Sequence, residues 1–166
     1  MANKIDLKNV TLKIKDDGSE EIELKFDTGN FTFSDQIAHD YDLDRGTLDT
    51  VSLGDEIPVD ISFTGRFDYY EGDSGDPTLP DALRKRGEAS AWVSTVSGIS
   101  GQECSPYAVD LELINTPTCS TGITNPIETL TFAQFRADSI AFDVVAGTVA
   151  VTGKCNITAP TSVRSA

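Results

Sequence analysis

Apolar and polar residues alternate with a period of two along several stretches of the chain, as they do in β-strands with one buried face. Residues 10–15 alternate Val, Leu and Ile with Thr and Lys. Residues 22–26 repeat the pattern after Asp17-Gly18, and an Asp-Gly pair is a frequent turn signal. We therefore expect a β-hairpin near the N-terminus.

Three further segments alternate in the same way. The longest runs over residues 57–70, with Val59, Ile61, Phe63, Phe67 and Tyr69 in one row. Residues 107–115 alternate next, and residues 140–144 and 149–151 flank a turn at Ala146-Gly147. These patterns predict two long strands and a second hairpin.

One helix is expected at about residues 79–87. Thr78-Leu79-Pro80-Asp81 resembles a capped helix start with proline in the first turn, and Gly87 is a plausible stop. So short a helix is stable only when it packs against other elements. The pattern thus predicts a mainly β chain with one short helix on the sheet.

Length and composition favour one domain over residues 1–166, with a polar C-terminal arm at 156–166. Hydrophobic residues make up 39% and charged residues 24%, which excludes a disordered chain. No apolar run reaches the roughly 18 residues of a membrane-spanning helix. The N-terminal residues lack the apolar stretch of a signal peptide, so we expect synthesis in the cytoplasm.

The chain is strongly acidic, with 27 acidic against 13 basic residues and a net charge of −14. Such a chain repels phosphates, which argues against nucleic-acid binding. The acidity provides solubility, or a surface that stays near DNA without binding it. Acidic residues recur on the polar faces of the predicted strands, opposed by Lys13, Lys25 and Arg66; they are Glu21, Glu23, Asp60, Asp68, Asp110, Glu112 and Asp143. Ordinary polar-out alternation explains the same pattern.

Catalytic residues are hard to find. The single histidine, His39, stands beside Asp40 in what reads as an acidic loop, without a nucleophile motif. A hydrolase needs a nucleophile, a base and an orienting group. We expect His39 to be a surface or capping residue, and we expect no enzymatic activity and no cofactor.

Metal binding is equally weak as a hypothesis. Asp40, Asp42 and Asp44 resemble the start of a calcium loop, but the sixth and twelfth positions hold Arg45 and Val51 instead of Gly and Glu. The acidic loop with Glu71, Asp73 and Asp76 offers a loose calcium site or simply a solvated loop. We expect no resident metal.

Three cysteines, Cys104, Cys119 and Cys155, lack the Cys-x-x-Cys spacing of zinc sites. An odd number in a cytoplasmic product usually means free thiols. Cys104 and Cys119 bracket a predicted strand that spans about 30 Å, too far for a disulfide unless the chain turns back. Cys155 could reach either of them across strands or between subunits, so a disulfide among the three stays open.

Three stretches, in this order, resemble the tail tube proteins of long-tailed bacteriophages. They are residues 43–63 (LDRGTLDTVSLGDEIPVDISF), 104–113 (CSPYAVDLEL) and 142–156 (FDVVAGTVAVTGKCN). The resemblance runs from about Val10 to Asn156, and the order of the segments carries it rather than any catalytic motif. It implies an antiparallel β-sandwich or partial barrel with one short flanking helix. It also implies stacked hexameric rings that form a hollow tube for the phage genome.

The resemblance further implies sites and partners within a virion tail. Acidic strand residues would face the lumen, with Asp60, Asp68, Asp110, Glu112 and Asp143 as candidates. The loop 71–77, with Glu71, Asp73 and Asp76, and the C-terminal arm would stack the rings. Partners would be further copies of the chain, tail terminator, baseplate and tape measure proteins, and a sheath protein if the tail contracts. DNA would pass without specific binding, because an acidic wall offers phosphates no counterion release.

Two other interpretations remain. A calcium- or carbohydrate-binding β-sandwich module would use Trp92, Tyr69 and Tyr70 as stacking residues, although Trp92 also suits a core. Another tail or baseplate component would share a related fold, and the length of the chain favours the repeating tube subunit.

Overall fold

The computed structural model describes residues 10–24, 30–66, 76–116 and 127–165. Within them the chain is mainly β, with an antiparallel sheet and one short helix, which confirms the predicted class. The elements are β1 (Val10–Lys15), β2 (Glu21–Leu24), β3 (Phe31–Ser34), β4 (His39–Asp44), β5 (Thr47–Leu53), β6 (Val59–Arg66), α1 (Leu79–Arg84), the 3-10 helix η2 (Gly87–Ala91), β7 (Val109–Asn115), β8 (Ile127–Asp143), β9 (Thr148–Cys155) and β10 (Thr161–Ser165).

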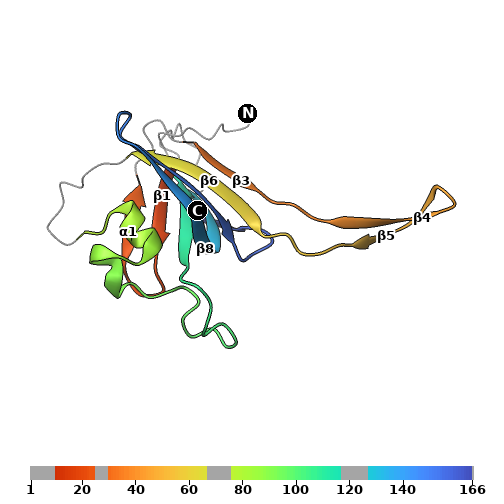
Figure 1. Cartoon of the computed structure of the whole chain (residues 1–166), viewed down its shortest axis with the longest axis horizontal. Coiled ribbons are helices and arrows are strands. Elements are labelled where there is room, and N and C mark those ends of the chain that lie inside the picture. The colour runs from red at the N-terminus through yellow and green to blue at the C-terminus, as the bar shows by residue number, and fades with distance from the viewer. Residues whose placement is uncertain (1–9, 25–29, 67–75, 117–126, 166) are drawn as a thin grey trace.

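Eight of the described strands form one sheet in the order β2-β1-β7-β8-β9-β6-β3, and β10 pairs with the first part of β8. The sheet is not a closed barrel, so β2 and β3 remain its edges. Strands β4 and β5 form a separate two-stranded sheet. Figure 1 shows this pair as a long arm that leaves the body on the side opposite α1.

Both predicted hairpins are present. β1 pairs with β2 antiparallel, and β8 pairs with β9 around the turn at residues 144–147. The strand expected at 57–70 is β6, and its residues 67–70 lie outside the described part of the chain. β6 alternates buried and exposed positions over most of its length, as the period of two predicted.

The helix is shorter than predicted and ends at Arg84, before Gly87. Lys85 closes it in the left-handed conformation with φ 51°, and its N–H bonds to the carbonyl of Asp81. Gly87 also has a positive φ, 53°, but it opens η2. A Cβ there would lie 2.9 Å from the Asp81 carboxylate, so glycine suits this close turn.

The hydrophobic core lies between the sheet and α1 with η2. Its largest fully buried side chains include Phe63, Phe132 and Phe135, and α1 contributes Leu79 and Leu83. Burying each such side chain is worth about 1.5–3 kcal/mol. Trp92 also belongs to the core and is 3% exposed, so the stacking role considered for it is wrong.

Gly153 of β9 marks a close approach of two strands. The β8–β9 register shifts between Ala137 and Ser139, and the bulge brings the backbone of Arg136 against Gly153. A Cβ on Gly153 would overlap the Arg136 carbonyl oxygen and would lie 2.7 Å from the Phe135 ring. The bulge thus requires glycine here.

Asp16 fixes the β1–β2 turn to the segment that follows η2. Its Oδ1 accepts from the N–H groups of Gly18 and Glu20, and its Oδ2 accepts from Val93 N–H at 2.9 Å. These three bonds satisfy a carboxylate that is only 9% exposed. The bond to Val93 joins parts of the chain that are 77 positions apart.

Two segments that were expected to be irregular form strands. Residues 39–44, expected as an acidic loop around His39, form strand β4. Residues 161–165 of the expected C-terminal arm form β10, whose five residues are all exposed although its backbone pairs with β8. Within the described ranges, no helix is both long and apolar enough to cross a membrane.

Candidate assembly interface

The most unusual feature of the structure is the β4–β5 ribbon, defined here as residues His39–Leu53. Its strands pair only with each other among the described elements, and every one of its residues is exposed. Figure 1 shows it projecting well beyond the body. An isolated two-stranded hairpin is at best marginally stable in water, because it buries neither face. The ribbon therefore needs a surface to cover it.

The ribbon is amphipathic. Residues paired directly across an antiparallel ladder point to the same side, so the register defines two faces. The apolar face comprises the pairs His39↔Leu53, Tyr41↔Val51 and Leu43↔Leu48. The acidic face comprises the pairs Asp40↔Ser52, Asp42↔Thr50 and Asp44↔Thr47.

The apolar face is largely uncovered. The exposed fractions are 63% for Tyr41, 64% for Leu43, 69% for Leu48, 57% for Val51 and 77% for Leu53. Single exposed hydrophobic residues are ordinary, but a contiguous row on a projecting element is typical of an interaction site. Apolar side chains that stay in water add nothing to the stability of a single copy.

A β-bulge keeps the apolar face continuous. The register shifts between Asp42 and Leu43, so Leu43 pairs with Leu48 and Asp49 is the extra residue. Without the shift, Asp49 would oppose Leu43 and place a carboxylate in the apolar row. The bulge therefore preserves amphipathicity where simple alternation would break it.

The tip and the base of the ribbon are both well defined. Arg45 and Gly46 form a two-residue turn with φ 51° and 83°, the positive values of a type I′ hairpin turn. At the base, Gly54 N–H bonds to the carbonyl of Ala38 at 2.9 Å. A Cβ on Gly54 would lie 2.9 Å from the Cβ of Ala38, so glycine allows the two connecting segments to run close together.

Much of the negative charge is concentrated here. Residues 35–56 hold seven acidic residues and one basic residue, Arg45, a net of −6 out of the −14 of the whole chain. On the ribbon itself, Thr50 Oγ1 donates to Asp42 Oδ2 at 3.2 Å. The ribbon thus combines a row of exposed apolar side chains with a row of exposed carboxylates.

Two of the predicted lumen residues lie on strands as expected, but each has a basic neighbour. Asp60 lies 3.5 Å from Lys154 Nζ, and Glu112 lies 2.7 Å from Lys15 Nζ. The described sheet surface therefore carries cross-strand ion pairs, and basic residues are more frequent on it than the three expected from the sequence, since Lys15 and Lys154 also lie beside its acids. Exposed pairs of this kind contribute at most about 1 kcal/mol each.

Asp110 and Asp143 also lie on strands, and both already accept hydrogen bonds from backbone N–H groups. Asp110 is half-buried, and its Oδ1 accepts from Gln134 N–H at 2.9 Å; burial raises the pKa of its carboxyl. Asp143 accepts from the N–H groups of Val145 and Ala146 and so caps the β8–β9 turn. Asp68 lies outside the described residues.

Of the predicted ring-stacking residues, Glu71 and Asp73 also lie outside the described residues. Asp76 is exposed, two residues before the N-cap of α1. No group of three potential metal ligands occurs among the described residues.

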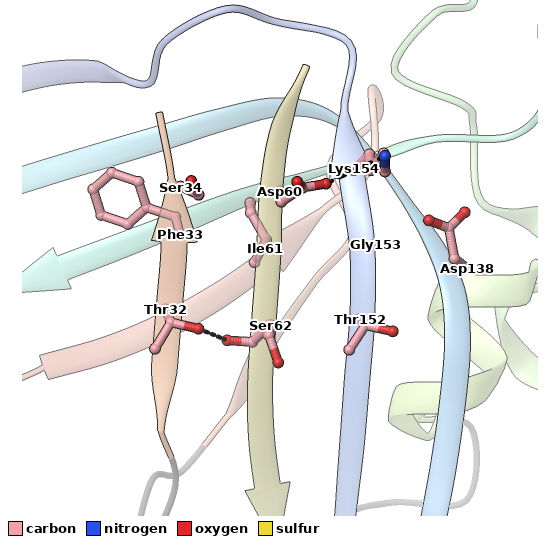
Figure 2. A pocket seen from close by; sticks show the side chains of 10 residues that line it. All are labelled: Thr32, Phe33, Ser34, Asp60, Ile61, Ser62, Asp138, Thr152, Gly153 and Lys154. Atoms are coloured by element: carbon pink, nitrogen blue, oxygen red, sulfur yellow. Dashed lines mark hydrogen bonds and ion pairs between the residues drawn. The ribbon is translucent and has the colours of Figure 1, made fainter. Parts of the chain in front are cut away.

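An open depression of about 380 Å³ lies on the polar side of the sheet (Figure 2). Thr32, Ser62 and Thr152 form one row across β3, β6 and β9, and the Asp60–Lys154 pair lies in the next row. Thr32 Oγ1 donates to the carbonyl of Ser62 at 3.3 Å. The depression is shallow and its charges are already paired, which suits a wet surface better than a tight small-molecule site.

The described cysteines are not bonded to each other. Cys104 is an exposed free thiol and Cys155 a buried one, while Cys119 lies outside the described residues. Burial raises the pKa of the Cys155 thiol to about 12, so this thiol is unreactive in the folded chain.

In comparisons with known proteins, no protein-family model matched the chain, and no curated protein was similar to it. The ribbon and the distribution of charge around it are therefore the features of the molecule that bear on its function.

Proposed function

We propose that the protein is a non-catalytic structural subunit that assembles with copies of itself into the tail tube of a long-tailed bacteriophage. One observation carries the proposal: the β4–β5 ribbon, whose apolar face is left exposed by the residues that the structure describes. The resemblance of residues 43–63, which include most of the ribbon, supports the tail-tube assignment.

The ribbon favours an assembly that propagates over a closed dimer. It projects from one end of the molecule, and a ribbon that is covered by a different patch of the next copy makes a heterologous contact (Figure 1). Such heterologous contacts produce rings when the rotation closes and filaments when it does not. A tube of stacked rings uses both kinds of contact: one closes each ring, and the other continues from ring to ring.

The open sheet edges support the same conclusion. β2 and β3 end the sheet, and their outer backbone groups are free to pair with a neighbouring strand among the elements described. Lateral pairing would close a hexameric ring, and the ribbon would bridge copies. Asp60 and Glu112, together with Asp68, Asp110 and Asp143, stay the candidates for a lumen wall. The net charge of −14 means that such a wall offers the phosphates of DNA no counterion release.

Within this proposal, the partners are other copies of the chain, the tail terminator, baseplate and tape measure proteins, and a sheath protein if the tail contracts. The location would be the virion tail. Contacts with these partners involve ring faces, where loops and chain ends gather.

Electron microscopy tests the proposal. Purified protein is concentrated, the salt concentration is raised to screen the repulsion between acidic copies, and the sample is examined in negative stain. The proposal predicts sixfold rings or hollow tubes. Protein that stays monomeric at every concentration and salt condition, or that stops at a closed dimer, contradicts it.

A further inference from the structure

The acidic face of the ribbon is as exposed as the apolar face, and its carboxylates have only weak partners: Thr50 Oγ1 donates to Asp42 at 3.2 Å, and Arg45 Nε lies 3.9 Å from Asp44 Oδ1. Asp40, Asp42 and Asp44 lie two residues apart on the same side of β4, so neighbouring carboxylates are spaced by about 6.7 Å. Copies that carry a net charge of −14 repel one another. A contact that brings this face against another copy therefore requires a basic surface opposite it.

The chain offers such a surface in Arg84, Lys85 and Arg86, three consecutive basic residues that are all exposed. α1 ends at Arg84, Lys85 turns with φ 51°, and Arg86 is extended with φ −126°. Because the backbone changes direction at each residue, the three side chains spread apart instead of following one helix face. We call residues 84–86 the basic segment.

The contacts of the basic segment within its own chain are weak. Arg84 Nη2 donates to the carbonyl of Asp138 at 3.4 Å, and Lys85 Nζ lies 5.9 Å from the centre of the Tyr107 ring. Elsewhere lysines approach carboxylates at 2.7–2.8 Å, as Lys15 does at Glu112 and Lys13 at Glu21. The guanidinium groups of the basic segment can still form paired hydrogen bonds with a carboxylate, which suits an acidic partner.

The ribbon cannot reach the basic segment of its own chain. Figure 1 shows α1 on the far side of the body from the ribbon, along the longest axis of the molecule. The two surfaces can meet only between copies, and the contact is head to tail when each ribbon docks on a different copy. Such a contact uses one surface of each kind per copy, and it leaves both surfaces available at the ends of a growing assembly.

We propose that the acidic face of the ribbon docks on the basic segment of a second copy. The inference rests on the proposed self-assembly and names the receptor for one face of the ribbon. The apolar face then packs on another surface, so each ribbon is held from both sides. A ribbon inserted in this way is stabilised by assembly, although it buries nothing in the monomer.

Charge reversal tests the pairing. One variant carries Asp40→Lys, Asp42→Lys and Asp44→Lys, and a second carries Arg84→Glu, Lys85→Glu and Arg86→Glu. Each alone places like charges opposite each other, and we expect the concentration for half-assembly, measured by sedimentation velocity, to rise about tenfold or more. An equimolar mixture of the two restores assembly, because each ribbon then meets a segment of opposite charge.

A matched control carries Asp17→Lys, Glu20→Lys and Glu103→Lys, which makes the same change of net charge at exposed positions outside the ribbon. We expect this control to assemble at the wild-type concentration or below it, because it reduces the repulsion between copies. Unchanged thermal melting of each variant shows that the fold is intact.

The outcomes separate the inference from the proposed function. Wild-type protein that never assembles removes both. Wild-type protein that assembles, together with reversed variants that assemble equally well, overturns the pairing alone. If neither variant assembles alone and their equimolar mixture does not assemble either, the pairing is also overturned, because the acidic face then docks on another surface.

Discussion

Replacing Leu48 and Leu53 by serine is predicted to weaken self-assembly severely without destabilising the monomer. The two side chains are 69% and 77% exposed, so most of their area is available to a partner. Burying a whole leucine side chain is worth about 1.5–3 kcal/mol, so covering the exposed part is worth about 1–2 kcal/mol. The double variant then loses about 2–4 kcal/mol per contact, or roughly 30- to 1,000-fold in the association constant.

The monomer has little to lose from the same change. The ribbon strands pair only with each other among the described elements, and neither leucine belongs to the buried core. Substitutions at such positions usually change the free energy of unfolding by less than about 0.5 kcal/mol. We therefore expect the melting temperature of the dilute monomer to stay within about 2 °C of wild type, given the length of the chain.

The assay is sedimentation velocity over a concentration series, combined with thermal melting at the lowest concentration. Ile99→Ser and Ile127→Ser serve as controls, because these residues are 37% and 38% exposed and lie outside the ribbon. The controls should assemble as wild type does. Assembly of the double variant at wild-type concentrations would refute the reasoning, and so would a large drop in its melting temperature, which would mean that the ribbon already packs within the monomer.

Three further predictions concern the body of the protein. Gly153→Ala forces a Cβ into the backbone of the neighbouring strand, and we expect a loss of about 3 kcal/mol in the free energy of unfolding, measured with urea. Asp16→Ala removes the acceptor of three backbone N–H groups, and we expect a similar loss of about 3 kcal/mol in the same assay. Burial, the main cause, raises the pKa of the Asp110 carboxyl in the folded protein. At a pH above that pKa the carboxyl is ionised, and its ionisation lowers the free energy of unfolding. This loss of stability disappears as the pH falls through the pKa. Asp110→Asn should therefore be more stable than wild type at pH 7. The difference between the two free energies of unfolding, measured by urea titration, should shrink as the pH is lowered. A difference that grows at lower pH would contradict the raised pKa of Asp110.

Alternation alone predicted the strands of the body whose buried faces are regular. β1 and β6 are examples, because every second side chain enters the core and the period of two survives in the sequence. β8 was predicted only at its end, since register shifts against both neighbours break the period along its 17 residues. β10 buries no side chain, so it leaves no apolar pattern to detect.

The ribbon was missed for two physical reasons. β4 does alternate, but three of its residues are aspartates, which are rare in strands and suggested a loop. In β5 the bulge at Asp49 places Leu48 and Val51 three positions apart, which breaks the alternation although both belong to one face. The strand pairing, which only the structure supplies, is needed to recognise that face.

The predicted lumen surface illustrates the same limit. The sequence shows that Asp60 and Glu112 lie on polar strand faces, and the structure agrees. It does not show that Lys154 and Lys15 stand beside them, because cross-strand neighbours depend on the register. The acidic residues along each strand therefore predicted a more acidic sheet surface than the structure has.

The central claim is that the β4–β5 ribbon is an interface between copies, and hydrogen exchange measured by mass spectrometry tests it most directly. In the dilute monomer, amides of residues 39–53 should exchange rapidly, because the ribbon is exposed and marginally stable by itself. In the assembled protein the same amides should become strongly protected, while the core strand β6, already protected in the monomer, changes little. Assemblies in which residues 39–53 exchange as fast as in the monomer would contradict the claim.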